Sequence, residues 1–317
     1  MSTTSEFSGY LYAHFKRETA DGEQIHFALS EGNDPLHFND LNGGRPVLTS
    51  VLGECGVRDP HIVRSPEGDR FFMVATDLCV NKDADWDRHV RWGSRSIMVW
   101  ESGDLVDWGE GRLVEVAPPE AGNAWAPESV WDPEQEAYLV HWSSTLYDDT
   151  EHQGVSYNRI LCATTRDFRE FSEPRVWLDR GWQTLDTTVI DHDGVYYRFL
   201  KDIRARDGAA PNGRSIYCET ATSLTAPDWA PLAEGIGLGT IVEGEGPLVY
   251  QSNTEDKWYL WIDEFSGGRR YVPFETDDLT GGQWTPSPDF RLPRNPCHGT
   301  VLPVTGEEYE RLRTALG

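Results

Sequence analysis

The sequence is poor in basic residues and contains no long apolar run. Lysine and arginine total 28 residues against 53 aspartates and glutamates, so the formal net charge is −25 at pH 7. A surface of this charge repels polyanions, which excludes nucleic acids and anionic membrane surfaces as partners. No stretch approaches the roughly 20 apolar residues that a membrane-spanning helix needs, so no membrane partner is expected.

Cysteine is also scarce. The five cysteines, at positions 55, 79, 162, 218 and 297, are an odd number and lack the paired spacing of a metal site. Scattered thiols of this kind are typical of a reducing compartment. The N-terminal MSTTSEFSGYLYAHF has no basic segment followed by an apolar run, so no secretion signal is predicted. We expect a cytoplasmic protein, or a secreted one if a leader was removed.

Aromatic residues, glycine and proline are plentiful. The 317 residues include 13 tryptophans, and 38% of them are hydrophobic, which is enough for a substantial core. The 30 glycines and 19 prolines suit many short strands joined by turns. The chain is long enough for two ordinary domains or one large β-rich domain.

One sequence pattern occurs five times. It opens with a polar residue, continues into β-branched residues and breaks at a turn rich in Gly, Asp or Glu. We call these segments heads, and they are VRDPHIVRSPEGDRFFMVATDL (57–78), APESVWDPEQEAYLVHWSS (126–144), DTTVIDHDGVYYRFLKDI (186–203), EGPLVYQSNTEDKWYLWIDEF (245–265) and HGTVLPVTGEEYERL (298–312).

A second pattern, a strand followed by a short acidic turn and an aromatic residue, comes after every head but the last. These tails are residues 96–108, 160–171, 215–229 and 270–284, and a fifth tail at 24–38 precedes the first head. Four complete units plus a split fifth predict a ring in which the two chain ends share one sheet. Such a closure removes free strand edges.

The first four heads carry acids at positions 59, 128, 186 and 245, a spacing that suits four-stranded blades. We therefore predict an all-β, five-bladed β-propeller that forms one domain over residues 1–317. The alternative is a β-sandwich of similar strand count. One helix is expected at GEEYERLRTAL (306–316). The expected blades are 57–115, 124–178, 183–232 and 241–290, with the fifth built from 7–48 and 296–304.

The innermost strand of each propeller blade begins at one end of the central channel, so the opening side chains of the heads should converge there. Four carboxylates that converge at one end of the channel repel one another, and at least one of them must hold a proton or find a partner. Glycosidic cleavage needs such a set: one acid protonates the leaving oxygen, and another activates water or attacks directly. A third can keep the pKa of the donor high. The side chains are Asp59, Glu128, Asp186, Glu245 and His298.

The order of these motifs resembles glycoside hydrolase family 43 over nearly the whole chain. The similarity rests on the Asp59-Pro60 head, WAP (125–127), Asp186 and EGP (245–247), with GYLYAHF and GEQIHFALS near the N-terminus and HGTVLPVTGEEYERL near the C-terminus. It implies that Asp59 is the general base, Glu245 the general acid, and Asp186 the carboxylate that orients Glu245 and tunes its pKa. It also implies inversion, with the carboxyl groups of Asp59 and Glu245 roughly 6.5–9.5 Å apart.

Two positions depart from the family pattern. DTT (186–188) stands where Asp-Pro is usual, and EGEGP (243–247) offers Glu243 as a competitor of Glu245. We favour Glu245 because it directly precedes Gly-Pro. For Asp59, Asp186 and Glu245 the alternative is a structural role, capping a turn or pairing with an arginine.

The remaining two openers have no catalytic counterpart in the family. Glu128 either accepts hydrogen bonds from sugar hydroxyls or pairs with an arginine. The resemblance implies that His298 lies near a calcium or other ion in the channel and contacts it through water, since calcium prefers oxygen ligands. The alternative for His298 is a structural histidine in the core. No organic cofactor is expected.

Two insertions should surround the pocket, one at 79–95 and one at 145–158. Long loops on repeat folds often form the binding face. Trp125 is expected to stack on a sugar. Trp86 and Trp92 either join it or pack the first insertion onto its own blade. Loops around the channel mouth favour release of single terminal sugars over cleavage within a chain.

The predicted function is therefore an inverting, exo-acting glycoside hydrolase that releases terminal furanose from plant-type oligosaccharides, with α-L-arabinofuranosidase preferred. Within the same family the alternatives are a β-D-galactofuranosidase, a β-xylosidase and an exo-hydrolase of galactans. A catalytically silent carbohydrate-binding propeller is the alternative from another class. A propeller of WD repeats is disfavoured, because it needs units of roughly 40 residues with a Trp-Asp signature. The oligomeric state stays open.

Overall fold

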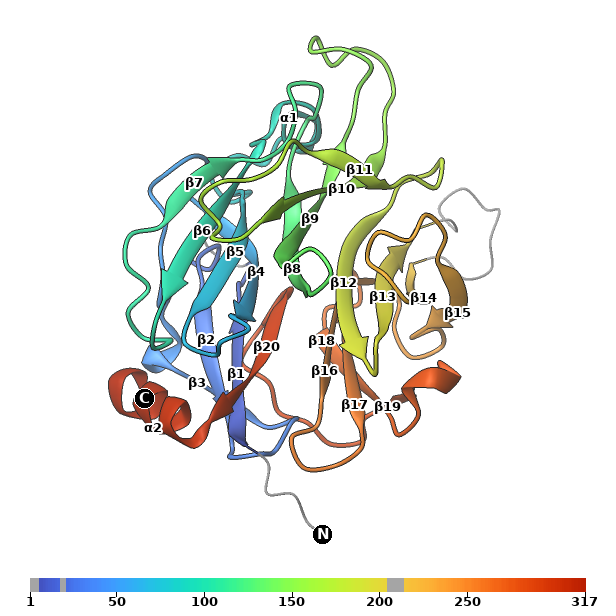
Figure 1. Cartoon of the computed structure of the whole chain (residues 1–317). Helices are drawn as coiled ribbons and strands as arrows, with labels where there is room; N and C mark the ends of the chain where they lie inside the picture. The colour runs from blue at the N-terminus through green and yellow to red at the C-terminus, as the bar shows by residue number, and fades with distance from the viewer. Residues whose placement is uncertain (1–5, 18–20, 204–213) are drawn as a thin grey trace.

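The computed structural model describes residues 6–17, 21–203 and 214–317. The expected fifth blade includes 18–20 and the expected third blade includes 204–213, and these segments lie outside the described residues, as do residues 1–5. Five four-stranded antiparallel sheets stand around a central axis, which confirms the five-bladed β-propeller (Figure 1). Within the described residues, no helix is long and apolar enough to cross a membrane.

Each blade is a meander whose first strand lies innermost. The first blade contains β4 (Val57–Arg64), β5 (Phe71–Asp77), β6 (Ser96–Ser102) and β7 (Arg112–Glu115). The second contains β8 (Trp125–Asp132), β9 (Ala137–Thr145), β10 (Asn158–Thr165) and β11 (Arg175–Leu178). The third contains β12 (Leu185–His192), β13 (Val195–Asp202), β14 (Ser215–Ala221) and β15 (Ala230–Ile236). The fourth contains β16 (Gly244–Gln251), β17 (Trp258–Glu264), β18 (Arg270–Thr276) and β19 (Thr285–Pro286).

The fifth blade joins the two ends of the chain, as the split repeat predicted. Its strands are β20 (Gly299–Thr305), β1 (Phe7–His14), β2 (His26–Ser30) and β3 (Phe38–Asp40), in that order across the sheet. β20 pairs antiparallel with β1, with Leu302 opposite Leu11. Figure 1 shows the red β20 beside the blue β1. This pairing closes the ring, because β20 also contacts both β16 and β4.

The hydrophobic core lies between neighbouring blades rather than in one central mass. One cluster joins the fifth and first blades and includes Phe27, Met73 and Trp108, all of them buried. Separate clusters fill the spaces between the other neighbouring blades. Strands such as β5 are therefore buried on both faces and read as continuous apolar runs.

A β-bulge interrupts the innermost strand of each of the first four blades at the end that opens the channel. In the first blade, Arg58 pairs with Thr76 and His61 with Val74, so two residues face one on β5. The other three blades show equivalent register shifts. One residue in each bulge has a left-handed backbone: Asp59 (φ 51°), Ala126 (φ 46°), Asp186 (φ 50°) and Gly246 (φ 52°).

These bulges explain why an acid next to proline opens a buried strand. A bulge leaves a residue outside the ladder, so a proline there loses no hydrogen bond. Proline follows the left-handed residue in three of the four blades, at Pro60, Pro127 and Pro247. Asp186 adopts the same conformation although Thr187 follows it, so the DTT sequence does not change the geometry of the third blade.

In the described part of the chain, two α-helices accompany the blades. The expected C-terminal helix is α2 (Gly306–Leu316), which begins with a capping box between Thr305 and Glu308. Arg64 of the first blade donates to Glu308 at 2.9 Å and thereby links α2, which follows the fifth-blade strand β20, to the first blade. The other helix, α1 (Trp86–Trp92), lies in the insertion that we expected to be a loop. The Asp85 side chain caps its N-terminus by accepting two backbone N–H groups. Short 3-10 turns occur at η1 (Asn42–Gly44) and η3 (Leu279–Gly281).

The close pairing of β20 with β1 at the ring closure requires a glycine at position 299. A Cβ atom at this residue would lie 2.0 Å from the carbonyl oxygen of Ala13 on the paired strand. We expect Gly299→Ala to lower the free energy of unfolding by about 1–3 kcal/mol, the usual cost of overpacking, in urea or thermal unfolding. Gly103→Ala is the matched control, because nothing lies within 4 Å of its Cβ position. Equal stability of the two variants would contradict this account of the closure.

Candidate functional site

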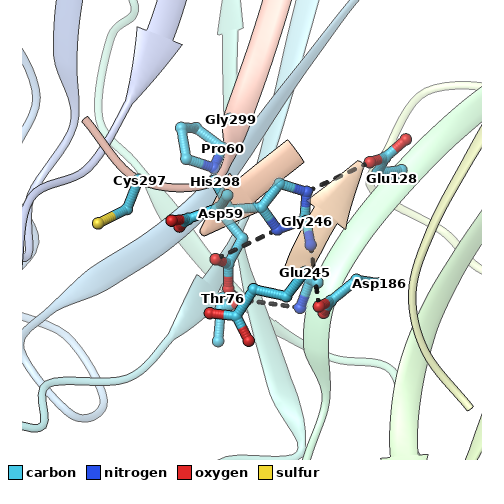
Figure 2. Close-up of polar contacts among 12 residues, drawn as sticks. Asp59, Pro60, Thr76, Glu128, Asp186, Glu245, Gly246, Cys297, His298 and Gly299 are labelled. Carbon is cyan, nitrogen blue, oxygen red and sulfur yellow. Dashed lines mark hydrogen bonds and ion pairs between the residues drawn. The ribbon is translucent and has the colours of Figure 1, made fainter. Parts of the chain in front are cut away.

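The channel opens into a cavity of about 710 Å³ at the end where the four bulges lie. Asp59, Asp186, Glu245 and His298 all line this cavity. Figure 2 shows the three carboxylates grouped around His298 and Gly246. The structure thus brings together four of the five opening side chains, each from a different blade. Glu128 is not among the residues that line the cavity.

Asp59 is oriented by a hydroxyl group on the neighbouring strand. Thr76 Oγ1 donates to Asp59 Oδ2 at 2.8 Å and accepts the backbone N–H of Ala126 at 2.7 Å. Because the N–H of Ala126 occupies a lone pair of the hydroxyl, its single proton is directed at Asp59. The other oxygen, Asp59 Oδ1, faces His298 Nδ1 at 3.5 Å.

Asp186 is held by both neighbouring blades, through a backbone N–H of the fourth and a side-chain hydroxyl of the second. Its Oδ2 accepts the N–H of Gly246 at 3.2 Å, and its own N–H donates to Ser143 Oγ at 3.3 Å. Burial raises the pKa of Asp186, and the charges of Glu245 and Asp59 act in the same direction, against those of Lys201 and His298. Asp186 therefore retains its proton more readily than a solvent-exposed aspartate does.

Gly246 is required at its position for two reasons. Its φ of 52° suits glycine, and a Cβ atom there would lie 2.8 Å from the ring of His298. Its carbonyl oxygen also accepts the hydroxyl of Tyr271 at 2.8 Å. The EGP motif therefore combines an acid, the residue that allows His298 to approach closely, and a bulge proline.

Glu245 lies between two cations. Lys201 Nζ donates to its Oε2 at 2.8 Å, and Arg17 Nη2 donates to its Oε1 at 2.5 Å. Burial opposes the ionised form, but Lys201 and Arg17 outweigh it and lower the pKa of Glu245 to about 2. Without substrate, Glu245 is ionised at neutral pH. Its competitor Glu243 pairs with Arg214 and does not line the cavity.

Glu128 lies deeper in the channel than we expected. Ala126, not Glu128, takes the left-handed bulge position in the second blade, and Glu128 follows two residues later. It is 5% exposed and lies between two histidines, with its Oε2 3.6 Å from His61 and its Oε1 3.8 Å from His298. It lines a second, smaller cavity of about 230 Å³ together with His61. The partners of Glu128 are thus histidines rather than an arginine.

The ring of His298 is not placed to bind an ion directly, and the expected contact with an ion through water stays a prediction. Both ring nitrogens face carboxylates, those of Asp59 and Glu128. Burial favours the neutral ring, but these two contacts raise the pKa of His298 well above its ordinary value. A protonated ring has no lone pair to offer a metal. In the part of the chain that the structure describes, no three His, Cys, Asp or Glu side chains are arranged as metal ligands.

The three tryptophans divide between two roles. Trp86 and Trp125 both line the cavity and meet edge to face, with ring centroids 6.2 Å apart. Trp92 instead stacks on His152 of the second insertion at 4.3 Å, and neither residue lines the cavity. The second insertion therefore packs against α1, and the cavity lining does not include it.

Several residues of the site were missed by sequence reasoning. They occupy one equivalent position on the second strand of each of the first four blades, opposite the residue that precedes the left-handed bulge residue. In the fourth blade that preceding residue is Glu245. The four residues are Thr76, Ser143, Lys201 and Asp263. In an antiparallel hairpin the end of the second strand lies beside the start of the first, so this position was open to inference. Arg17 carried no comparable signal.

The fold and the site together define a carbohydrate-active class of propeller, in which carboxylates and an aromatic wall meet at the mouth of the channel. Residues 5–310 match the profile of a family described as a probable glycosyl hydrolase domain and related to glycoside hydrolase family 43. The chain belongs to this family.

Known proteins place the chain within this group. It is 38% identical over 238 residues to an α-L-arabinofuranosidase of Bifidobacterium longum subsp. longum. The match covers 69% of this chain but 22% of that protein. A thermostable family-43 glycoside hydrolase has the same fold, with a TM-score of 0.53 and 19% identity over 77% of this chain and 76% of that one. The catalytic domain of a Coprinopsis cinerea family-62 α-L-arabinofuranosidase gives a TM-score of 0.51 with 16% identity over 78% of this chain and 72% of that one.

The hydrogen bond from Thr76 makes a prediction about Asp59. Thr76→Val keeps the side-chain shape but removes the donor to the carboxylate. We expect kcat for glycoside hydrolysis to fall about 10- to 100-fold with little change in KM, since hydrogen bonds to charged groups contribute about 1.5–3 kcal/mol. Thr76→Ser, which retains the hydroxyl, should recover most of the rate. Full activity of the valine variant would show that Asp59 does not need this contact.

Proposed function

We propose that the protein is an inverting, exo-acting glycoside hydrolase that releases terminal α-L-arabinofuranose from oligosaccharides. The observation that carries this proposal is the meeting of Asp59, Asp186 and Glu245 in one cavity of about 710 Å³ with an aromatic wall. A cavity of this size accommodates a small number of sugar units. The preference for arabinofuranose is supported by the name of the Bifidobacterium longum relative.

In the proposed reaction Asp59 takes a proton from water, and the water oxygen bonds to the anomeric carbon. The bond from that carbon to the glycosidic oxygen breaks, and Glu245 donates a proton to the departing oxygen. Asp59 is suited to the first role because it only accepts hydrogen bonds there, with one oxygen fixed by Thr76. Asp186 stabilises the segment that carries Glu245 through the N–H of Gly246.

Glu245 must gain a proton before it can act as the acid, although its two cations favour the ionised state. Lys201 and Arg17 both line the cavity, so sugar hydroxyls can accept their N–H groups when substrate binds. Each hydrogen bond given to the sugar weakens the hold on the carboxylate. Desolvation by the bound sugar also favours the neutral carboxyl group. Substrate binding and protonation of Glu245 are therefore coupled.

Replacing Glu245 tests its role as the proton donor. Glu245→Gln should lower kcat/KM for an alkyl α-L-arabinofuranoside about 10²- to 10⁴-fold, the usual contribution of general acid catalysis. The loss should be much smaller for a 4-nitrophenyl arabinofuranoside, because its leaving group departs with little protonation. Asp59→Asn should inactivate the enzyme toward both substrates.

Glu243→Gln is the matched control, since Glu243 pairs with Arg214 outside the cavity lining. It should retain activity toward both substrates. If Glu245→Gln kept full activity and Glu243→Gln lost it, Glu243 and not Glu245 would be the general acid. The same assay with β-D-galactofuranosides, β-xylosides and galactans identifies the sugar. Binding of pentoses without turnover of any substrate would instead indicate a carbohydrate-binding propeller.

Inversion predicts the configuration of the first product. Attack by water from the face opposite the leaving group converts an α-L-arabinofuranoside to β-L-arabinofuranose. Proton NMR during the first minutes of hydrolysis should show the β-anomeric signal before mutarotation produces the α form. Early appearance of the α-anomer would mean retention, and with it a covalent intermediate that the proposal does not include.

A further inference from the structure

Equivalent second-strand residues support the inner strand of the next blade around the ring. Thr76 of the first blade accepts the N–H of Ala126 in the second, at 2.7 Å. Ser143 of the second blade accepts the N–H of Asp186 in the third, at 3.3 Å. Lys201 of the third blade donates to Glu245 of the fourth, at 2.8 Å. A set of residues at one structural position therefore orients the chemical groups of the site.

Asp263 is the member of this set in the fourth blade. It lies directly opposite Glu245 in the β16–β17 ladder. Its Oδ2 accepts from Arg17 Nη2 at 3.3 Å, and the same nitrogen donates to Glu245 Oε1 at 2.5 Å. Arg17 follows β1 of the fifth blade, so Asp263 reaches the next blade as the other members do. Unlike the other members, Asp263 is also linked to Glu245, because Arg17 Nη2 donates to both carboxylates.

Asp263 is enclosed far more completely than the other carboxylates of the site. Its side chain has no solvent exposure, and its Oδ1 has no hydrogen-bond partner among the described residues. A buried carboxylate oxygen without a donor disfavours the ionised form. Burial raises the pKa of Asp263 to about 7, with Glu245 adding to the shift and Arg17 opposing it. Asp263 thus changes its charge near neutral pH, next to the proposed acid.

The groups that act on this pair come from every surrounding element. Arg17, Arg270 and His298 favour the ionised form of Asp263, and Glu245 disfavours it. Lys201 acts on Glu245 from the third blade. Asp263 in turn disfavours ionisation of three neutral groups: Tyr12, Tyr271 and Cys297. Among these groups, Arg17 contacts both carboxylates.

We propose that Asp263 is a positioning residue that competes with Glu245 for Arg17 and so controls how readily Glu245 accepts the proton that it donates in catalysis. When Asp263 is ionised, it attracts Arg17 and places a negative charge beside Glu245. Both effects favour the protonated form of Glu245. The inference rests on the proposed function, because it assigns Glu245 the role of acid.

Asp263→Asn tests this through the pH profile. The variant loses the competing charge, so Arg17 holds Glu245 more firmly and the pKa of Glu245 in the enzyme falls. The alkaline limb of kcat for an alkyl arabinofuranoside, which reports the substrate complex in which Glu245 gains its proton, should shift to lower pH by about one unit, with KM little changed. The aryl arabinofuranoside should show a smaller shift, because its departure needs little protonation.

Asp132→Asn is the matched control: Asp132 is a carboxylate with 2% exposure at the far end of β8, outside the cavity lining. Its profile should match that of the wild type. Asp263→Ser, which also removes the charge, takes the place of the asparagine variant if that one does not fold. An unshifted alkaline limb in a folded variant at position 263 would overturn the inference.

A second measurement separates this inference from the proposed function, since it needs no turnover. In protein labelled with ¹³C at the aspartate carboxyl carbons, one signal should titrate near neutral pH and disappear in Asp263→Asn. In Glu245→Gln that signal should titrate at lower pH, because a neighbouring charge is gone and Arg17 is released to Asp263. If Glu245→Gln left the titration of that signal unchanged, the inference would be refuted even in an active enzyme. A coupled pair in a protein that cleaves no glycoside would refute only the hydrolase proposal.

Discussion

The site depends on one backbone constraint, the bulge that opens the inner strand of each of the first four blades. A regular strand would alternate its side chains between the two neighbouring blades. The extra residue, held with a positive φ at Asp59, Ala126, Asp186 and Gly246, interrupts this alternation where Asp59, Asp186 and Glu245 line the cavity. Left-handed backbone is unfavourable for most residues, and bulges of this kind are common beside active sites. Closure of the ring holds the bulges in register and so maintains this strain.

Much of the fold was open to prediction because it follows from periodicity. The split repeat indicated the shared fifth blade, and the Gly- and Pro-rich turns indicated short strands. The offset at Glu128 was not predictable from acid spacing, since the feature that the second blade shares with the first, third and fourth is a conformation, carried by Ala126, and not a charge. Asp186 shows the reverse: its neighbour departs from the usual proline, yet its backbone conforms.

The supporting residues were harder to infer, because they act by register and not by motif. Thr76, Ser143, Lys201 and Asp263 differ in chemistry and share only their position opposite the start of the inner strand. Arg17 is harder still: it reaches Glu245 from a segment 228 residues away in sequence. Such contacts arise only when the ring closes and the chain ends come together. The same closure that the repeats predict therefore creates a contact that they cannot predict.

The charge balance of the cavity differs from that of the protein surface. The chain carries a formal charge of −25, yet Arg17, Arg58 and Lys201 all line the cavity beside its carboxylates. Each of these cations has a carboxylate partner: Glu245 and Asp263 for Arg17, Glu23 for Arg58, and Glu245 for Lys201. Paired in this way, the buried carboxylates avoid the mutual repulsion that their convergence would otherwise cause. A neutral sugar can exchange hydrogen bonds with these pairs without adding charge, whereas an anionic ligand would disrupt the balance. The electrostatics of the cavity therefore favour an uncharged ligand, in agreement with the proposed glycoside substrate.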